Sequence, residues 1–495
     1  MSTKKEHFQN IKKYFALTQN DIDPMRNVFI ADEVIYRGIL DNRVKITEEL
    51  FEKGIVDKLI DEGLLTDSKL EFINFKKYTF LVRQSELLPP TPSSELPPSL
   101  KRDIGLILLR IHEILNQYKM TLVDFNYNDI CINKKGRPVF HNLDSIIYSE
   151  YQLFSFSVFY AKFLGPLNLV NERPELINTL QYITQLSIDE DISIRRPKLK
   201  KLIHLISSLG VVGNKINRFY FRVIMSPFYG LFNMGLYAKF INESLKEKRK
   251  RQKKINLAPS NWPIILNKYI YKHLTSLKFD GISQKWTNYH THLNLHDIVN
   301  SNENWENSFY GPRDQALLKI LDSIERGTLL DIGANNGYFS ILSAKKGYET
   351  TAVDYDIGAI DNLYKILVKS NYELTIRPLI LDFPQLNPET SLRFKSDVVF
   401  ALGFVHHMRL VELLPWSVIV KKLSDLTSKV LVTEYKNDTG ASNSNTKLTE
   451  NIKSDYSLEI LLKHLNDYFD YVEVVGDFSQ VGAQSVRTMI VCKRL

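Results

Sequence analysis

The 495-residue sequence is poor in cysteine: Cys131 and Cys492 are the only two. Two cysteines cannot form a disulfide framework, and these lack the spacing of a metal site, so no metal is predicted. The first twenty residues contain no apolar run, so no secretory signal is expected. The sixteen residues from Val223 to Ala238 carry no charge, but sixteen is short for a membrane span. These absences favour a reducing, cytoplasmic setting.

The net charge of +8 is spread unevenly along the chain. Residues 206–285 contain fifteen Lys and Arg against three acids, a net of +12, so the rest of the chain is net negative. The basic character therefore belongs to one segment and says little about the chemistry of the other parts.

An aromatic segment and a basic run lie next to each other within residues 219–254. Seven of the nine residues from Lys246 to Lys254 are basic. This arrangement fits a peripheral membrane contact, but Pro227 and Gly230 interrupt the apolar part, and a buried helical pair followed by a solvated basic run fits as well. No aromatic residue is interleaved with the basic run, so no nucleic-acid partner is expected.

The chain is too long for a single core, and its 44% hydrophobic and 24% charged residues are those of a globular protein. We predict an α+β domain over residues 1–205, a basic helical linker over 206–285 and an α/β domain over 286–495.

In the first part, the hydrophobic patterns predict short strands and helices around a proline-rich connector that begins at Pro89. The predicted elements are strands at Val28–Ala31, Glu33–Arg37 and Tyr78–Arg83 and helices at Thr47–Gly63 and Leu100–Tyr118.

From Arg313 onward, strands and helices alternate, which predicts a mostly parallel sheet covered on both faces and closed by an antiparallel pair. The expected strands are Thr328–Ile332, Thr350–Asp354, Ile376–Asp382, Asp397–Leu402, Lys429–Glu434, Tyr471–Val475 and Thr488–Cys492, and the expected helices are Asp314–Ile324, Tyr338–Lys346, Ile357–Lys369, Pro415–Leu426 and Ser457–Tyr468.

The strongest chemical signal is a glycine-rich turn between the first of these strands and the following helix. It reads Asp331-Ile-Gly333-Ala-Asn335-Asn-Gly337, and Asp354 ends the next strand 23 residues after Asp331. Glycines permit a sharp turn and a close approach of the backbone to a ligand, and a carboxylate at the second strand tip can accept hydrogen bonds from ribose hydroxyls.

This arrangement fits either a dinucleotide or S-adenosylmethionine. The spacing is G-x-x-x-G and not the G-x-G-x-x-G that admits a pyrophosphate. An acid at Asp331 would repel phosphates, whereas it can hold the cationic amino-acid end of S-adenosylmethionine. The turn therefore favours S-adenosylmethionine, with a purely structural turn as the alternative.

Three further strand ends carry candidate site residues. Asp382 is placed to bind the adenine amino group, with Phe383 beside it as a ring contact. His406, His407 and Glu434 follow the fourth and fifth strands, where ligands of open α/β sheets bind. Any of the three could take a proton from a hydroxyl or amine during methyl transfer, although positioning alone can supply much of the rate.

With these motifs, the chain resembles class I methyltransferases, and specifically the bacterial nodulation-protein-type family with an extra N-terminal domain. The resemblance implies an S-adenosylmethionine-dependent methyltransferase that acts on an O or N nucleophile of a small-molecule or glycan acceptor. It also implies cofactor contacts at Asp331, Gly333, Asn335, Gly337, Asp354 and Asp382. The matching stretches are Trp286–Tyr289, Leu330–Ser340, Ala352–Asp356, Pro378–Asp382, Ala401–Met408 and Val432–Glu434.

The N-terminal part resembles the kinase arrangement of a catalytic Asp, a metal-binding Asn and a metal-binding Asp, but in degenerate form. Asp124, Asp129 and the stretch Asn142-Leu-Asp144 carry the resemblance, while the expected Asn is Asp129 and the expected Asp is Asn142. We therefore predict a kinase-like fold without activity. A bifunctional kinase–methyltransferase and a non-catalytic S-adenosylmethionine-binding regulator remain as alternatives.

Overall fold

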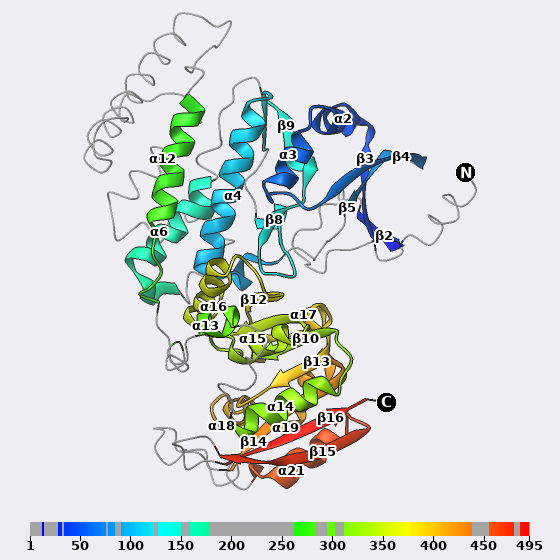
Figure 1. Cartoon of the computed structure of the whole chain (residues 1–495), viewed down its shortest axis with the longest axis vertical. Helices are drawn as coiled ribbons and strands as arrows, with labels where there is room; N and C mark the ends of the chain where they lie inside the picture. Colours follow the sequence, from blue (N-terminus) through cyan, green and yellow to red (C-terminus); the bar gives the residue numbers. More distant parts are fainter. Residues whose placement is uncertain are drawn as a thin grey trace, which may run out of the picture.

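The computed structural model describes residues 12–13, 28–31, 34–75, 78–84, 91–122, 127–149, 159–177, 262–282, 287, 295–301, 311–437, 455–479 and 486–494. Asp124 and the aromatic and basic segment 219–254 lie outside these residues, and so does Trp286. The described chain has two parts, an N-terminal part with a five-stranded sheet and a C-terminal part with a seven-stranded sheet (Figure 1).

The C-terminal sheet has the strand order β12-β11-β10-β13-β14-β16-β15. Its parallel strands are β10 (Thr328–Ile332), β11 (Glu349–Asp354), β12 (Ile376–Ile380), β13 (Ser396–Ala401) and β14 (Thr427–Lys436). Two antiparallel strands, β15 (Tyr471–Ser479) and β16 (Val486–Lys493), close the edge. The mostly parallel seven-stranded α/β sheet is thus confirmed.

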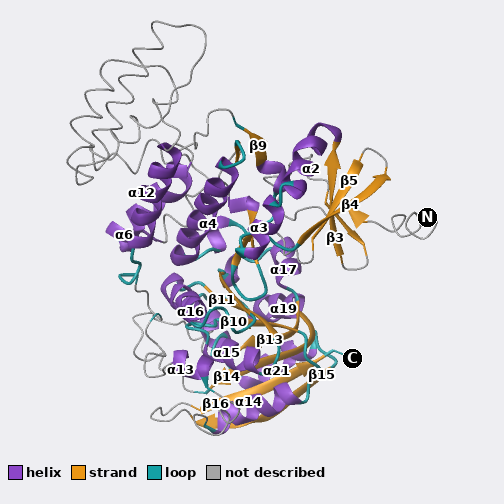
Figure 2. Ribbon diagram, turned by 45° about the horizontal axis from the view of Figure 1, so that its top comes forward, coloured by secondary structure: helices purple, strands orange, loops and turns teal. Residues whose placement is uncertain are grey.

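The strands bury residues on both faces because helices cover both sides (Figure 2). Leu329, Val398 and Phe400 pack on one side, with α14 (Pro312–Asp322) and α15 (Tyr338–Lys345). Neighbouring residues such as Leu330 and Val399 pack on the other side, with α19 (Trp416–Leu426) and α21 (Leu458–Asn466). Helix α16 (Ile357–Lys369) contributes to both clusters.

The order of strands places a topological switch in the middle of this sheet. From β10 the chain winds outward to β11 and β12, and then returns to the other side of β10 with β13 and β14. Ligands of open α/β sheets bind where the winding reverses, over the carboxyl ends of the strands. The loops after β10 and β13 therefore border the expected site.

The N-terminal sheet is antiparallel, in the order β1-β2-β3-β5-β4. Its strands are β1 (Lys12–Lys13), β2 (Val28–Ala31), β3 (Val34–Leu40), β4 (Ser68–Phe75) and β5 (Tyr78–Gln84). Strand β4 was not predicted. The single helix predicted over Thr47–Gly63 is wrong: α2 (Val44–Glu52) and α3 (Ile55–Asp61) are separate, because Gly54 has a φ of 64° and ends the first helix.

Helix α4 (Pro98–Asn116) follows the proline-rich connector and is the longest described helix of this part. After it come β6 (Met120–Leu122), the hairpin of β7 (Ile130–Ile132) and β8 (Pro138–Phe140), β9 (Ile146–Tyr148) and α6 (Gly165–Glu172). Helix α12 (Trp262–Ser276), in the predicted linker, packs on α4, and Leu274 lies against Gly105.

The two parts are joined by a buried polar contact and a continuous apolar core. The backbone N of Ser99 and its Oγ donate to the two carboxylate oxygens of Asp361 on α16, at 2.7 and 2.9 Å. Tyr364, one helical turn further on, donates to Asp103 at 2.8 Å. Lys134 of the β7–β8 hairpin pairs with Glu349 of β11. The N-terminal part is therefore docked onto the helix that follows Asp354.

Within the residues that the structure describes, no helix combines the length and the apolar character needed to cross a bilayer.

Candidate active site

The glycine-rich turn after β10 has the left-handed backbone that its residue types favour. Gly333, Asn335 and Gly337 have φ values of 75°, 51° and 81°. A Cβ on Gly333 would lie 2.9 Å from the Phe404 ring, and one on Gly337 would lie 2.6 Å from Leu363. The Cβ directions of both glycines are thus occupied by protein side chains, so the glycines serve the sharp turn and the packing of α15 against α16.

Asp354, at the tip of β11, holds this turn in place. One carboxylate oxygen accepts from the backbone N of Asn335 and the other from the backbone N of Asp356, each at 2.8 Å. The side chain is buried, and burial raises its pKa to about 6. Each carboxylate oxygen has a second lone pair, so Asp354 can accept further hydrogen bonds from a ligand.

Asp331 lies at the tip of β10, beside Asp354. Its carboxylate accepts a 2.6 Å hydrogen bond from Ser340 on α15. Burial, together with the negative charge of Asp354, raises the pKa of Asp331 to about 7. In the described part of the chain, no Lys or Arg forms an ion pair with Asp331 or Asp354. The turn therefore lies over two buried acids that accept hydrogen bonds but face no positively charged side chain among the described residues.

Thr287 lies over the same turn. It belongs to the stretch Trp286–Tyr289, but the sequence pattern did not identify it as a site residue. Its Oγ1 donates to Asp356 at 2.7 Å, and its carbonyl oxygen accepts from the Asn336 side chain at 3.2 Å. The remaining side-chain oxygen of Asn336 is buried with no hydrogen-bond partner among the described residues. Thr287 thus ties the glycine-rich turn to the N-terminus of α16.

Asp382 and Phe383 follow β12 as predicted, in a short 3-10 turn. Asp382 is half-buried, accepts from Gln385 at 2.8 Å and has its pKa raised by burial. Phe383 is buried and meets Phe404 edge to face, with ring centroids 5.0 Å apart. Since Phe404 also touches Gly333, these aromatic rings bring the loops after β10, β12 and β13 together.

The two histidines lie on the short helix α18 (Val405–Leu410). Their ring centroids are 4.0 Å apart. His406 is buried, and its Nδ1 has no partner among the described residues. Burial, followed by the charges of His407, Arg487 and Lys436, lowers the pKa of His406 to about 2. A neutral His406 can exchange hydrogen bonds with a ligand, but it is a weak base.

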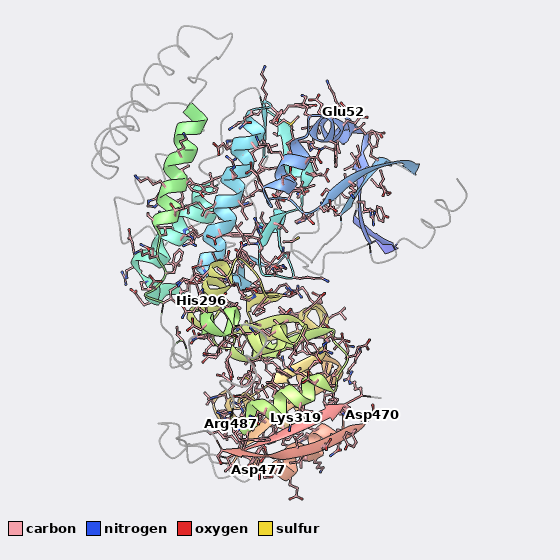
Figure 3. All side chains as sticks on the ribbon, in the orientation of Figure 1. Glu52, His296, Lys319, Asp470, Asp477 and Arg487 are labelled. Atoms are coloured by element: carbon pink, nitrogen blue, oxygen red, sulfur yellow. The ribbon has the colours of Figure 1, made fainter. Side chains whose placement is uncertain are left out.

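Glu434, on β14, is buried and strongly engaged. It accepts from Arg313 at 2.6 and 2.8 Å and from the backbone N of Gly403 at 2.9 Å. Arg487 of β16, labelled in Figure 3, adds a 3.4 Å contact. Glu434 thus connects α14, β16 and the loop after β13, and no sequence signal pointed to its arginine partners.

The remaining sequence predictions concern a metal site and the kinase-like residues of the N-terminal part. Among the described residues, no cluster of three or more His, Cys, Asp or Glu side chains could hold a metal ion. Asp129, Asn142 and Asp144 lie together in the N-terminal part: Asn142 donates to Asp129, and Asn142 and Asp144 contact arginines.

Comparison with known proteins gives one curated relative and several solved structures. No family model matches the sequence. The chain is similar to nodulation protein NoeA of Rhizobium meliloti (strain 1021), with 23% identity over 209 residues, which are 40% of this chain and 41% of that protein. The chain thus matches about two-fifths of the length of this relative, and the predicted resemblance to nodulation proteins is confirmed.

Two of the similar solved structures are a domain of EvdMO1 and the enzyme WbdD. The N-terminal domain of EvdMO1, crystallised in the presence of SAH and D-fucose, matches 38% of this chain and 84% of its own, with 15% identity and a TM-score of 0.29. The bifunctional kinase-methyltransferase WbdD matches 36% of this chain and 37% of its own, with 15% identity and a TM-score of 0.27.

Proposed function

We propose that the C-terminal part, residues 286–495, is an S-adenosylmethionine-dependent methyltransferase that acts on an O or N nucleophile. One observation carries this proposal. Asp331 and Asp354 are buried side by side at the switch point of the sheet, and the described protein offers them no cation. Two uncompensated acids favour a positively charged ligand and disfavour a pyrophosphate. S-adenosylmethionine carries a positive sulfonium and an ammonium group.

The residues around the turn fit the parts of this cofactor. Asp354 would accept hydrogen bonds from the ribose hydroxyls, and Asp331 would face the cationic amino-acid end. Gly333, Asn335 and Gly337 form the turn beneath it, and the orphaned oxygen of Asn336 supplies a further acceptor. Asp382 would bind the adenine amino group, with Phe383 as the ring contact.

When bound, S-adenosylmethionine supplies a methyl group on a positively charged sulfur. The chain's own contribution is to orient the acceptor and to exclude water at the loops after β13 and β14. His407 would bind or receive the proton of the nucleophile, and the neutral His406 would exchange a hydrogen bond with it, while Glu434 holds the Gly403 backbone through its hydrogen bond. Positioning supplies much of the rate in such a displacement, so no strong base is required.

The acceptor is proposed only by class. The similarity to a nodulation protein supports a glycan or glycolipid as the methyl acceptor. A cytoplasmic location and a peripheral membrane contact through residues 219–254 are part of the same proposal, and the two buried cysteines, which form no disulfide, agree with a reducing compartment.

The N-terminal part is proposed to keep a kinase-like arrangement that recognises the acceptor or controls access to the transferase. An antiparallel sheet, a long helix and a hairpin flanked by Asp129 and Asp144 support this reading. Its contacts with α16, through Asp361 and Tyr364, support a role close to the cofactor site.

Calorimetry with S-adenosylmethionine on the wild type and on Asp354→Asn tests the cofactor site. Loss of the charged acceptor is expected to weaken binding by about ten-fold or more. Asp397→Asn is the matched control, because Asp397 also accepts from a backbone N–H, that of Thr328, but lies at the amino end of β13, away from the carboxyl ends of the strands. Equal affinity in Asp354→Asn and wild type would refute the ribose assignment.

A search for methylated products separates an enzyme from a regulator. Incubation with S-adenosylmethionine and a bacterial glycan and glycolipid extract should release S-adenosylhomocysteine. Tight cofactor binding without any product across such extracts would favour the non-catalytic regulator.

A further inference from the structure

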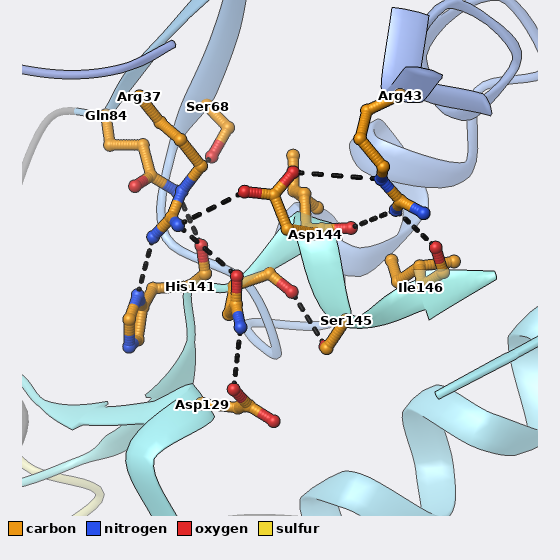
Figure 4. A network of polar contacts seen from close by, with 11 residues as sticks. Arg37, Arg43, Ser68, Gln84, Asp129, His141, Asp144, Ser145 and Ile146 are labelled. Carbon is orange, nitrogen blue, oxygen red and sulfur yellow. Dashed lines mark hydrogen bonds and ion pairs between the residues drawn. The ribbon is translucent and has the colours of Figure 1, made fainter. Parts of the chain in front are cut away.

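Arg37 lies at the centre of a buried polar network in the N-terminal part (Figure 4). It comes from β3, and its Nη1 donates to the Asn142 side-chain oxygen at 3.3 Å and lies 3.5 Å from Asp144. Its Nη2 lies 3.1 Å from Nδ1 of His141. Since an arginine can only donate, this histidine nitrogen is the acceptor and carries no proton.

The acids of this network are compensated by the protein itself. Arg43 lies 3.9 Å from the second oxygen of Asp144, so both oxygens of that carboxylate face a guanidinium group. Asp129 accepts a 2.7 Å hydrogen bond from the Asn142 side-chain nitrogen. Asp144 thus faces two guanidinium groups, and Asn142 links Asp129 to Arg37 through its amide.

The orientation of Asn142 decides whether a metal ion fits between these acids. Its amide oxygen points to Arg37 and its amide nitrogen to Asp129. A magnesium ion needs about six oxygen ligands at about 2.0–2.1 Å, and two ions of like sign repel one another in a partly buried site. An amide that turns its nitrogen to one acid and its oxygen to an arginine offers no oxygen to a metal held by both acids.

We propose that Arg37 takes the place that a divalent metal ion has in a kinase, so that the N-terminal part binds neither Mg²⁺ nor a magnesium–nucleotide complex. In protein kinases the third strand carries a lysine that contacts the nucleotide phosphates, and metal ions are held by the Asp and Asn residues further along the chain. Here the third strand carries an arginine that reaches those residues directly. This inference rests on the kinase-like arrangement proposed above and is independent of the methyltransferase proposal.

The polar cluster around Arg37 has a structural role in the N-terminal part. The arginines hold β3 and the turn after it to the segment that carries Asn142 and Asp144 and leads into β9. With no phosphoryl transfer to perform, the part acts as a docked, non-phosphorylating partner of the transferase.

Manganese binding followed by electron paramagnetic resonance on the full chain tests the proposal. The wild type is expected to leave Mn²⁺ free, and Mg²⁺ with ATP should not raise its melting temperature. In Arg37→Met, Asp144 loses a cation and the Asn142 oxygen loses its donor, so Mn²⁺ affinity should increase by about ten-fold or more. The double variant Arg37→Met/Asp144→Asn should lose this binding again.

Arg110→Met is the matched control. Arg110 pairs with Glu62 and Glu113 in the same part of the chain, but all three side chains are partly exposed, so its loss should create no Mn²⁺ site. Equal Mn²⁺ binding by both single variants would refute a specific site.

The wild type decides the question even if Arg37→Met does not fold. Mn²⁺ binding by the wild type that Asp144→Asn removes would overturn the proposal. Because S-adenosylmethionine calorimetry on the same protein reports separately on the transferase, failure of one proposal leaves the other measurable.

Discussion

Each half of the molecule holds a pair of acidic side chains in a polar cluster, and the two clusters differ in what faces them. In the N-terminal part, Asp129 and Asp144 lie in a network with Arg37 and Arg43. In the C-terminal part, Asp331 and Asp354 interact with a hydroxyl and with backbone N–H groups, and their pKa values rise to about 7 and about 6.

The difference separates a completed polar core from a binding site. Burial of an ionised group costs free energy unless an opposite charge or several hydrogen bonds accompany it. The N-terminal network meets this requirement from within the chain. The C-terminal pair meets it only in part, because it has hydrogen bonds but no opposite charge. A cationic ligand would therefore stabilise the pair further. We interpret this as the source of affinity for S-adenosylmethionine.

The largest expected effect comes from removing the cation of the completed cluster. Arg37→Met should lower the free energy of unfolding by about 3 kcal/mol, because it removes the buried guanidinium group that contacts Asn142, His141 and the partly exposed Asp144. Urea unfolding in the absence of divalent ions measures this change. A loss below about 1 kcal/mol is typical of exposed surface ion pairs. Such a result would contradict the proposed difference between the two clusters.

A smaller effect of opposite sign is expected for the uncompensated pair. Asp331 binds a proton up to about pH 7 in the folded chain, against an ordinary value near 3.8. The folded state thus holds more protons across this window, so stability should fall as pH rises from about 4 to about 7. Asp331→Asn should remove much of this slope and stabilise the cofactor-free protein by about 2 kcal/mol near pH 8.

Cofactor binding should show the reverse pH dependence. The affinity for S-adenosylmethionine should increase between about pH 5 and pH 8, because the ionised carboxylates attract the cation. Unfolding curves across this range, with and without the cofactor, measure both trends for wild type and Asp331→Asn. A wild-type stability that rises through the window would contradict the raised pKa of Asp331.

The smallest expected effect concerns the contact over the turn. Thr287→Val removes the hydrogen bond to Asp356 at nearly constant volume and should weaken S-adenosylmethionine binding about three- to ten-fold. Thr287→Ser keeps the hydroxyl and should bind nearly as the wild type does. Calorimetry at one pH compares the three proteins, and equally weak binding by both variants would assign the effect to packing.

Much of the C-terminal fold could be predicted because its signals are local. The helix predicted over Ile357–Lys369 has those bounds in the structure, and the strand Thr328–Ile332 does too. Both follow from hydrophobic periodicity and from glycine at the turns. The N-terminal part was harder: the residue pattern over Thr47–Gly63 is helical almost throughout, and the break at Gly54 depends on its left-handed backbone.

By itself, the sequence determined the alternation of strands and helices, the glycine-rich turn and the acids at consecutive strand tips, because these depend on neighbours within one or two elements. The tertiary structure decided which acids have partners. Arg313 lies 121 residues from Glu434, and Arg37 lies 105 residues from Asn142. Charge compensation depends on distance in space, and only the folded chain brings such distant residues into contact.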